Sequence, residues 1–177
     1  MNPTPIIDQL YFARRRRAMS KYEYHAEELQ RNVLHYLIKA TANTEWGREH
    51  GYKDLRQYSD FTTHVGINTY EDLKGYILRM RKGESNILWR GKINWYAKSS
   101  GTTNDKSKFI PVSREGLKNI HYLGGTDCVA TYLGINPTSH LFAGKSLILG
   151  GSHTPNLNTP NSLVGDLSAI LIENVPS

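Results

Sequence analysis

The stretch most suited to chemistry is a run of small hydroxyl residues followed by lysines. Residues 99–108 read Ser-Ser-Gly-Thr-Thr-Asn-Asp-Lys-Ser-Lys, so that one glycine lies among hydroxyl side chains with Lys106 and Lys108 close behind. Consecutive backbone N–H groups in a turn form a concave anion site, and a glycine lets the chain approach a phosphate closely. Hydroxyl groups add hydrogen-bond donors, and lysines add positive charge. The composition therefore suggests a loop that holds a phosphate-bearing ligand.

Another interpretation of the same residues stays open. The stretch is not the G-x-x-x-x-G-K-[ST] phosphate loop, and no helix is predicted to start directly after it, so the loop itself would have to hold the phosphates. Turn chemistry alone favours an exposed Ser/Gly/Thr hairpin between two strands, with no ligand. The composition suggests a phosphate site without establishing one.

The residues around this loop resemble a known family. "SSGTTNDKSKFIP" resembles the ATP-phosphate motif of the adenylate-forming superfamily, and its two leading serines look most like the Gretchen Hagen family, the auxin-responsive acyl-acid amido synthetases and their bacterial relatives. Two further stretches, "NTEWGREHGY" and "TYEDLKGYILRMRKGESNILWRGKINWYAKSSGTT", are similar to segments that precede the loop in that family. The resemblance runs from Thr41 to Pro111, and more loosely across the whole chain.

The resemblance implies a role for each loop residue that matches the motif. The residues expected to enclose the β- and γ-phosphates of ATP are Ser99, Ser100, Gly101, Thr102 and Thr103. Lys108 aligns with the family's lysine and is expected to bind the phosphates and to be catalytic. Asp105 stands where many relatives carry glycine, which places a carboxylate near the expected phosphates, and Lys106 would offset it locally.

The resemblance also implies a reaction. In such enzymes a carboxylic acid attacks the α-phosphate of ATP, pyrophosphate leaves, and the amine of an amino acid then displaces AMP from the acyl-adenylate. ATP and Mg²⁺ are the implied cofactors, and the loop and the ion would stabilise charge on the leaving pyrophosphate. An acyl-CoA ligase of the same superfamily shares the first half-reaction and stays an alternative. The sequence identifies neither the acid, nor the acceptor, nor the oligomeric state.

The elements that must position the loop change character along the chain. Apolar residues at three- and four-residue spacings predict one long amphipathic helix over residues 10–40. Thr44 is expected to cap a short helix that stops near Gly51, and Thr69 to cap a second helix that ends before Gly83. The stretches "INWYAKS" and "KFIPV" predict two short strands on either side of the loop.

Four segments follow the second of these strands. Residues 114–134 predict a helix with a close-packing Gly124-Gly125 pair, "KSLILGGS" from Lys145 predicts a buried strand, residues 152–162 predict a loop, and "LVGDLSAILIENV" predicts a helix. The order predicts a mixed α/β fold. A helical N-terminal segment would span residues 1–92, and the start of an adenylate-forming-type α/β domain that binds ATP would span residues 93–177.

A sheet that ends with so few strands would leave an unshielded edge. We therefore expect this chain to be the N-terminal fragment of a longer protein, incomplete in its α/β domain and by itself lacking full catalysis.

The charge balance limits the partners only loosely. The formal net charge of +6 would attract phosphate-bearing ligands of many kinds. The run Arg14–Arg17 allows a non-catalytic basic binding module, but a solvated helix start explains these residues without nucleic acid or an anionic membrane. The seven histidines form no cluster at ligand spacing, so no structural metal is expected.

Cys128 is the only cysteine, which excludes an internal disulfide and favours a reducing, cytoplasmic compartment. We expect it to be a small buried side chain, not a nucleophile. The basic cluster follows a short apolar stretch, the reverse of a signal peptide, and no apolar run reaches the roughly 18 residues of a membrane-spanning helix. The implied partners are a small carboxylic acid and an amino acid, with no membrane and no nucleic acid.

Overall fold

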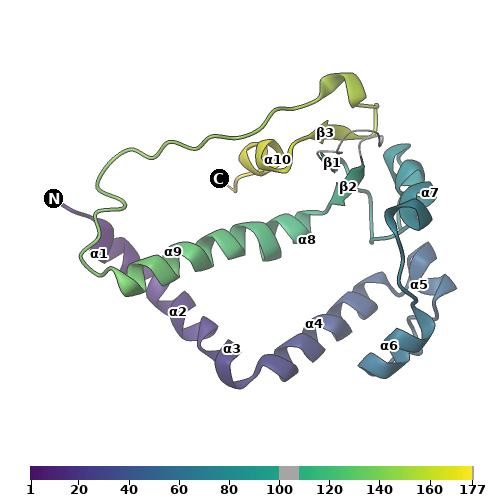
Figure 1. The fold of residues 1–177 in the computed structure, drawn as a ribbon, viewed down its shortest axis with the longest axis horizontal. Helices are drawn as coiled ribbons and strands as arrows, with labels where there is room; N and C mark the ends of the chain where they lie inside the picture. Colours follow the sequence, from purple (N-terminus) through teal and green to yellow (C-terminus); the bar gives the residue numbers. More distant parts are fainter. Residues whose placement is uncertain (100–107, 177) are drawn as a thin grey trace. The chain divides into compact units, whose positions relative to one another are not determined.

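The computed structural model describes residues 1–99 and 108–176 (Figure 1). The chain divides into two compact units. The first unit comprises Met1–Leu29 and Arg114–Leu149, and the second comprises Gln30–Ser113 and Gly150–Ser177. Each unit therefore combines two segments that are distant in the sequence. These units differ from the two segments expected from the sequence, residues 1–92 and 93–177. The domain boundary after residue 92 stays a prediction.

The first unit is helical. Its N-terminal segment contains α1 (Thr4–Ile7), a π-helical segment (Asp8–Phe12), α2 (Ala13–Met19) and α3 (Lys21–Tyr24). Its second segment contains α8 (Arg114–Gly116), another π-helical segment (Leu117–Tyr122) and α9 (Leu123–Ile135). The helix predicted over residues 114–134 is confirmed, because α8, the π-helical segment and α9 follow one another without a break (Figure 1).

Two arginines of the basic run join the elements of the first unit. Arg15 forms a two-pronged ion pair with Asp127 of α9, in which its Nη2 donates to Oδ2 at 2.8 Å. Arg16 forms a second such pair with Asp8 and also donates to the Ala130 carbonyl oxygen at 3.2 Å. The hydrogen bond from Arg15 lowers the pKa of Asp127 below its usual value. The expectation of a merely solvated run is therefore wrong for these two arginines.

The single long helix predicted over residues 10–40 is also wrong. The chain leaves helical geometry at His25, where φ is −130° and ψ is 25°, and α4 (Ala26–Thr41) begins directly afterwards. Glu27 and Glu28 lie in the first turn of α4, where carboxylates stabilise a helix N-terminus. The acidic pair marks a new helix start, which the continuous apolar spacing concealed.

The second unit combines helices with a small sheet. After α4, its helices are α5 (Glu45–Glu49), α6 (Tyr58–His64), α7 (Tyr70–Arg81), a 3-10 turn (Pro155–Leu157) and α10 (Leu167–Glu173). Its strands are β1 (Trp95–Lys98), β2 (Phe109–Val112) and β3 (Leu163–Gly165). The predicted mixture of helix and sheet is confirmed, as are the two strands that flank residues 100–107. Helix α6 and strand β3 were not predicted, and the helix expected from residue 163 begins only at Leu167.

Side-chain caps begin two of these helices where the sequence predicted them. The Thr44 hydroxyl accepts a hydrogen bond from the Gly47 N–H at 3.0 Å at the start of α5. At the start of α7, the Asp72 carboxylate accepts from both the N–H and the hydroxyl of Thr69 at 2.7 Å. Gly51 has a φ of 63°, the left-handed conformation that often ends a helix.

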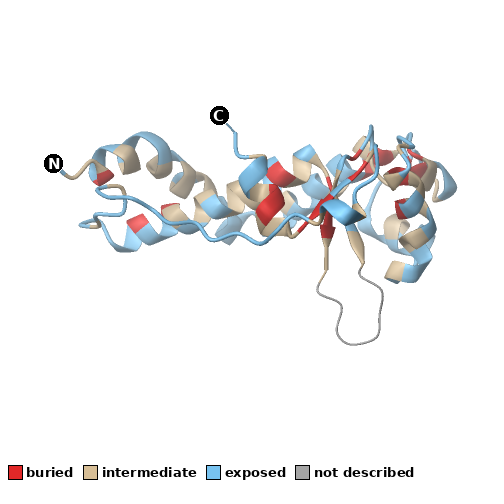
Figure 2. Cartoon of the chain, turned by 90° about the horizontal axis from the view of Figure 1, so that it is seen from above, coloured by how far each residue is buried: buried red, intermediate tan, exposed pale blue. Residues whose placement is uncertain are grey.

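The strands form one mixed sheet in the order β2-β1-β3. Strands β1 and β2 are antiparallel, with Lys98 opposite Phe109, and β1 and β3 are parallel, with Tyr96 opposite Val164. Tyr96 and Val164 are almost fully buried in a core cluster that includes Ile77 and Met80 of α7 (Figure 2). Helix α7 is therefore packed on the strands that flank the candidate loop.

Three expectations about the second half of the chain are wrong. The predicted buried strand is exposed and irregular, with Leu147 and Leu149 more than 80% exposed, because the described residues offer it no partner strand. Cys128 is exposed on α9. Among the described residues, no neighbouring segment packs closely on Gly124 or Gly125, since a Cβ added at either position would have no neighbouring atom within 4 Å.

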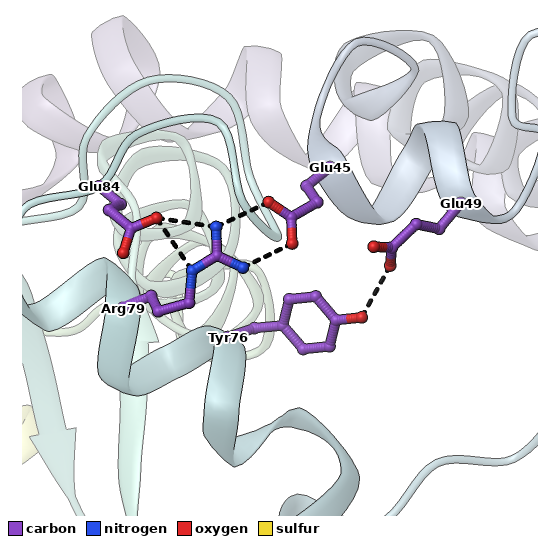
Figure 3. Close-up of polar contacts among 5 residues, drawn as sticks. All are labelled: Glu45, Glu49, Tyr76, Arg79 and Glu84. Carbon is purple, nitrogen blue, oxygen red and sulfur yellow. Dashed lines mark hydrogen bonds and ion pairs between the residues drawn. The ribbon is translucent and has the colours of Figure 1, made fainter.

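An ion-pair network holds α5 against α7 (Figure 3). Arg79 donates to both carboxylate oxygens of Glu45, at 2.6 and 2.8 Å, and to Glu84 at 2.9 Å. Beside it, the Tyr76 hydroxyl donates to Glu49 at 2.7 Å. The two-pronged geometry fixes the direction of the guanidinium group as well as its distance.

The Arg79 network should make stability depend on pH. The hydrogen bonds from Arg79 lower the pKa of Glu45, so the stabilisation they give is present above the ordinary carboxyl pKa of 4.5 and is lost as the pH falls through the lower value of the folded state. Arg79→Met should lower the free energy of unfolding at neutral pH, and its deficit relative to the wild-type protein should shrink at acidic pH. Urea unfolding of the wild-type and variant proteins, from neutral to acidic pH, measures this difference. A deficit that does not change with pH would contradict the assignment.

Two helical glycines should respond in opposite ways to alanine. A Cβ at Gly47 would lie 2.0 Å from the Thr41 carbonyl oxygen, whereas a Cβ at Gly75 would meet nothing within 4 Å. Gly47→Ala should therefore destabilise by about 3 kcal/mol or more, because backbone must move. Gly75→Ala, in the interior of α7, should stabilise by about 1 kcal/mol. Equilibrium unfolding checks both, and equal effects would refute the tight contact at Gly47.

Candidate functional site

The two described residues at the ends of the candidate phosphate loop, Ser99 and Lys108, are hydrogen-bonded to each other. The Ser99 N–H donates to the Lys108 carbonyl oxygen at 3.0 Å, directly beyond the last paired residues of β1 and β2. The antiparallel ladder thus holds both ends of the loop together. Four of the predicted phosphate-binding residues lie outside the described residues, as do Asp105 and Lys106. These four are Ser100, Gly101, Thr102 and Thr103.

The first residue of α7 contacts the Lys108 end of the loop. The Lys108 Nζ lies 5.5 Å from the centroid of the Tyr70 ring, within the range of a cation–π interaction. The Tyr70 hydroxyl accepts a hydrogen bond from the N–H of Phe109, the next residue, at 3.0 Å. Tyr70 thus contacts the lysine side chain and the backbone that follows it. Because Thr69 and Asp72 cap α7, the position of this ring is set by a fixed helix start.

The last residue of α7 contacts the same strand. The Arg81 guanidinium carbon lies 3.8 Å from the centroid of the Phe109 ring, and its Nη2 donates to the Leu157 carbonyl oxygen at 2.6 Å. Among residues 1–99 and 108–176, no carboxylate lies within ion-pair distance of Arg81. The cation is thus held by an aromatic ring and neutral oxygens.

Burial governs the ionisation of the groups around Arg81. It lowers the pKa of Arg81 from its usual value, and it raises the pKa of Tyr96, which lies beneath the guanidinium group, to about 12. The phenol therefore stays neutral and the guanidinium stays charged at neutral pH. Within the described residues, the positive charge beside β2 therefore does not depend on a titrating carboxylate.

Sequence reasoning placed Ser99, Lys108 and the two strands, but it missed the contacts of Tyr70 and Arg81. Tyr70 reads as an ordinary first-turn residue after a threonine cap, and Arg81 as one of several cations in a last helical turn. Their contacts depend on which residues of β2 pack against α7, and local sequence patterns do not show packing between segments that are distant in the sequence. The strong capping signal at Thr69 was the one clue that the start of α7 is fixed.

Comparison with known proteins decides the family. Residues 15–173 match the GH3 family N-terminal domain. The chain belongs to the GH3 family. The resemblance to the Gretchen Hagen family that the loop suggested is thereby confirmed.

The curated relatives are plant enzymes of this family. The chain is 31% identical over 125 residues to the indole-3-acetic acid-amido synthetase GH3.15 of Arabidopsis thaliana, a match that covers 69% of this chain and 20% of the relative. It is 31% identical over 95 residues to the jasmonoyl-L-amino acid synthetase JAR4 of Nicotiana attenuata, covering 53% of this chain and 16% of that protein. The GH3 chain thus spans a fifth or less of the length of these relatives.

The fold also matches solved GH3 structures. A GH3.15 acyl acid amido synthetase superposes with a TM-score of 0.67 at 26% identity, covering 84% of this chain and 26% of the other. The same kind of protein in complex with 2,4-DB gives a TM-score of 0.69 at 22% identity, which supports the fold alone. The mixed α/β architecture is therefore that of part of a GH3 protein.

The described residues contain neither a membrane-spanning helix nor a cluster of metal ligands. Within residues 1–99 and 108–176, no helix has both the length and the apolar character needed to cross a bilayer. In the same part of the chain, no three His, Cys, Asp or Glu side chains come together as a set of metal ligands.

Two substitutions of Tyr70 should separate its two contacts. Tyr70→Phe keeps the ring near Lys108 but removes the acceptor for the Phe109 N–H, and should lower the free energy of unfolding by about 1 kcal/mol. Tyr70→Leu removes both contacts and should lower it further. Tyr58→Phe, at a tyrosine that is 70% exposed, is the matched control and should change little. Urea unfolding measures all three, and a Tyr70→Phe variant as stable as the control would argue against the hydrogen bond.

Proposed function

We propose that the GH3 protein containing this chain is an ATP-dependent acyl-acid amido synthetase that joins a carboxylic acid to the amine of an amino acid. The observation that carries the proposal is the hairpin of β1 and β2, which brings Ser99 and Lys108 together at the ends of a family-matching loop. Membership of the GH3 family supports it, because the relatives are named as an indole-3-acetic acid-amido synthetase and a jasmonoyl-L-amino acid synthetase.

The proposed reaction has two steps. A carboxylate oxygen of the acid forms a bond to the α-phosphorus of ATP, and the bond to the pyrophosphate oxygen breaks. The amine nitrogen then bonds to the acyl carbon, the bond to AMP breaks, and the amine loses a proton. Negative charge accumulates on the leaving pyrophosphate in the first step, and a fixed cation stabilises such charge.

The described residues can take different parts in this step. The Ser99 N–H is already bound to the Lys108 carbonyl oxygen, so the Ser99 hydroxyl is the group left to donate to a phosphate. Among residues 1–99 and 108–176, the Lys108 ammonium group contacts an aromatic face and forms no ion pair with a carboxylate, and so in this proposal its charge is available to an anion. In this proposal Lys108 binds the phosphates, and the Tyr70 ring limits the directions that its side chain takes.

Mg²⁺ stays an expectation. The described residues bring together no set of side chains that would hold the ion, and Mg²⁺ in nucleotide sites is held largely by substrate phosphates and water. A cytoplasmic location also stays an expectation.

Lys108→Ala in the intact protein tests the proposal. If Lys108 contacts the phosphates, the variant should slow acid-dependent exchange of labelled pyrophosphate into ATP by about 10- to 100-fold, the value of a charge-assisted hydrogen bond. Lys118→Ala, at an exposed lysine of the helix that follows β2, is the matched control and should retain exchange. No exchange by the wild-type protein with any acid in a broad panel would overturn the proposal.

An acyl-CoA ligase and a non-catalytic basic binding module remain the alternatives. Product analysis separates the first, since a synthetase forms an amide with an amino acid whereas a ligase forms a thioester with coenzyme A. For the second, Arg14 and Arg17 are the exposed members of the basic run, because Arg15 and Arg16 form ion pairs. Loss of activity in cells on Arg14→Gln and Arg17→Gln, with Lys108→Ala silent, would favour the binding module.

A further inference from the structure

A hollow in the second unit combines an apolar floor with a basic rim. It has a volume of about 330 Å³ and lies between the C-terminal half of α4 and the segment from Tyr52 to Arg56. The buried side chains of Ile38, Tyr52 and Leu55 contribute to its lining. A volume of this size is at the lower end of the roughly 300–1,000 Å³ typical of small-molecule sites.

The rim of this hollow carries positive charge without compensation. Lys39, Lys53 and Arg56 all contribute to the lining, and no carboxylate does. Within residues 1–99 and 108–176, none of these three cations forms an ion pair, whereas Arg15, Arg16 and Arg79 each pair with a carboxylate. The rim therefore offers cations that no described acidic side chain neutralises.

Backbone carbonyl groups, His35 and Asp60 hold the rim in place. The Arg56 Nη1 donates to the carbonyl oxygens of Lys53, at 2.7 Å, and Leu55, at 3.2 Å. The His35 Nε2 lies 2.7 Å from the Arg56 carbonyl oxygen, which ties the segment to α4. Asp60 accepts from the Arg56 N–H at 2.9 Å, a contact with the backbone and not with the guanidinium group. The contacts orient Arg56, and its guanidinium group forms no ion pair within residues 1–99 and 108–176.

A second hollow, beside the core cluster formed by Ile38, Tyr52 and Leu55, has no charged residue in its lining. It has a volume of about 400 Å³, shares Ile38 and Tyr52 with the first, and is lined mainly by apolar and aromatic side chains with no charged residue among them. The basic residues thus gather at one of the two hollows. An apolar floor beneath a basic rim is complementary to a ligand with an apolar body and an anionic head.

We propose that the hollow bounded by Lys39, Lys53 and Arg56 binds a small amphiphilic anion, whose apolar body covers Ile38 and Leu55 and whose carboxylate or phosphate group lies at the rim. The lining includes neither Ser99 nor Lys108, the described ends of the candidate loop, so binding in this hollow requires no ATP chemistry. The anionic head comes either from a free organic acid or from an organic phosphate, and the two are distinguished by experiment.

Calorimetric titration of the intact protein with octanoate, octyl phosphate and octanol tests the site. The three probes share the same apolar body and differ in the head group. At least one of the two anions should bind more tightly than octanol by about tenfold or more, as expected from several solvent-exposed ion pairs acting together. The tighter of the two anions identifies the head group. Octanol binding as tightly as both anions would overturn the proposal.

Matched variants on one helix locate the binding. Lys39→Gln removes a rim cation that forms no ion pair among the described residues, and it should weaken binding of the preferred anion by about two- to fivefold while leaving octanol binding unchanged. Lys53→Gln should act in the same way. Arg31→Gln, two turns earlier on α4 at an exposed position outside the lining, should change neither. Equal effects of Lys39→Gln and Arg31→Gln would show that no site lies at this rim.

Discussion

The packing of α7 against β2 is the constraint on which the rest of the candidate site depends. Tyr70 at the start of the helix binds the Phe109 N–H and faces Lys108, and Arg81 at its end stacks on the Phe109 ring. The first residue of β2 is therefore held from both ends of one helix. Since Lys108 precedes it directly, the position of the lysine follows from the helix and not from the loop alone.

Positive charge serves different purposes in different parts of the chain. Arg15 and Arg79 are neutralised by carboxylates and join helices. Arg81 is held by an aromatic ring and by neutral oxygens, which keeps a cation close to the sheet. Lys39 at the basic hollow has no ionic partner among the described residues. A net charge of +6 therefore says little about ligands until each cation is assigned to its surroundings.

Local signals predicted local structure well. Threonine caps located the starts of α5 and α7, and apolar runs located β1 and β2, because these features depend on a few neighbouring residues. The apolar run over residues 145–149 failed as a strand predictor, because a strand also needs a partner, and the described residues provide none. For the site, the motif indicated Ser99 and Lys108, whereas the contacts of Tyr70 and Arg81 depend on the packing of α7 against β2.

In the proposed function, Lys108 contacts the phosphates of ATP. The most direct measurement is acetylation of lysines in the intact protein, read by mass spectrometry with and without ATP. We expect ATP to protect Lys108 from acetylation and to leave Lys118 unprotected. Equal acetylation of Lys108 at all ATP concentrations, in a protein that catalyses pyrophosphate exchange, would contradict the claim.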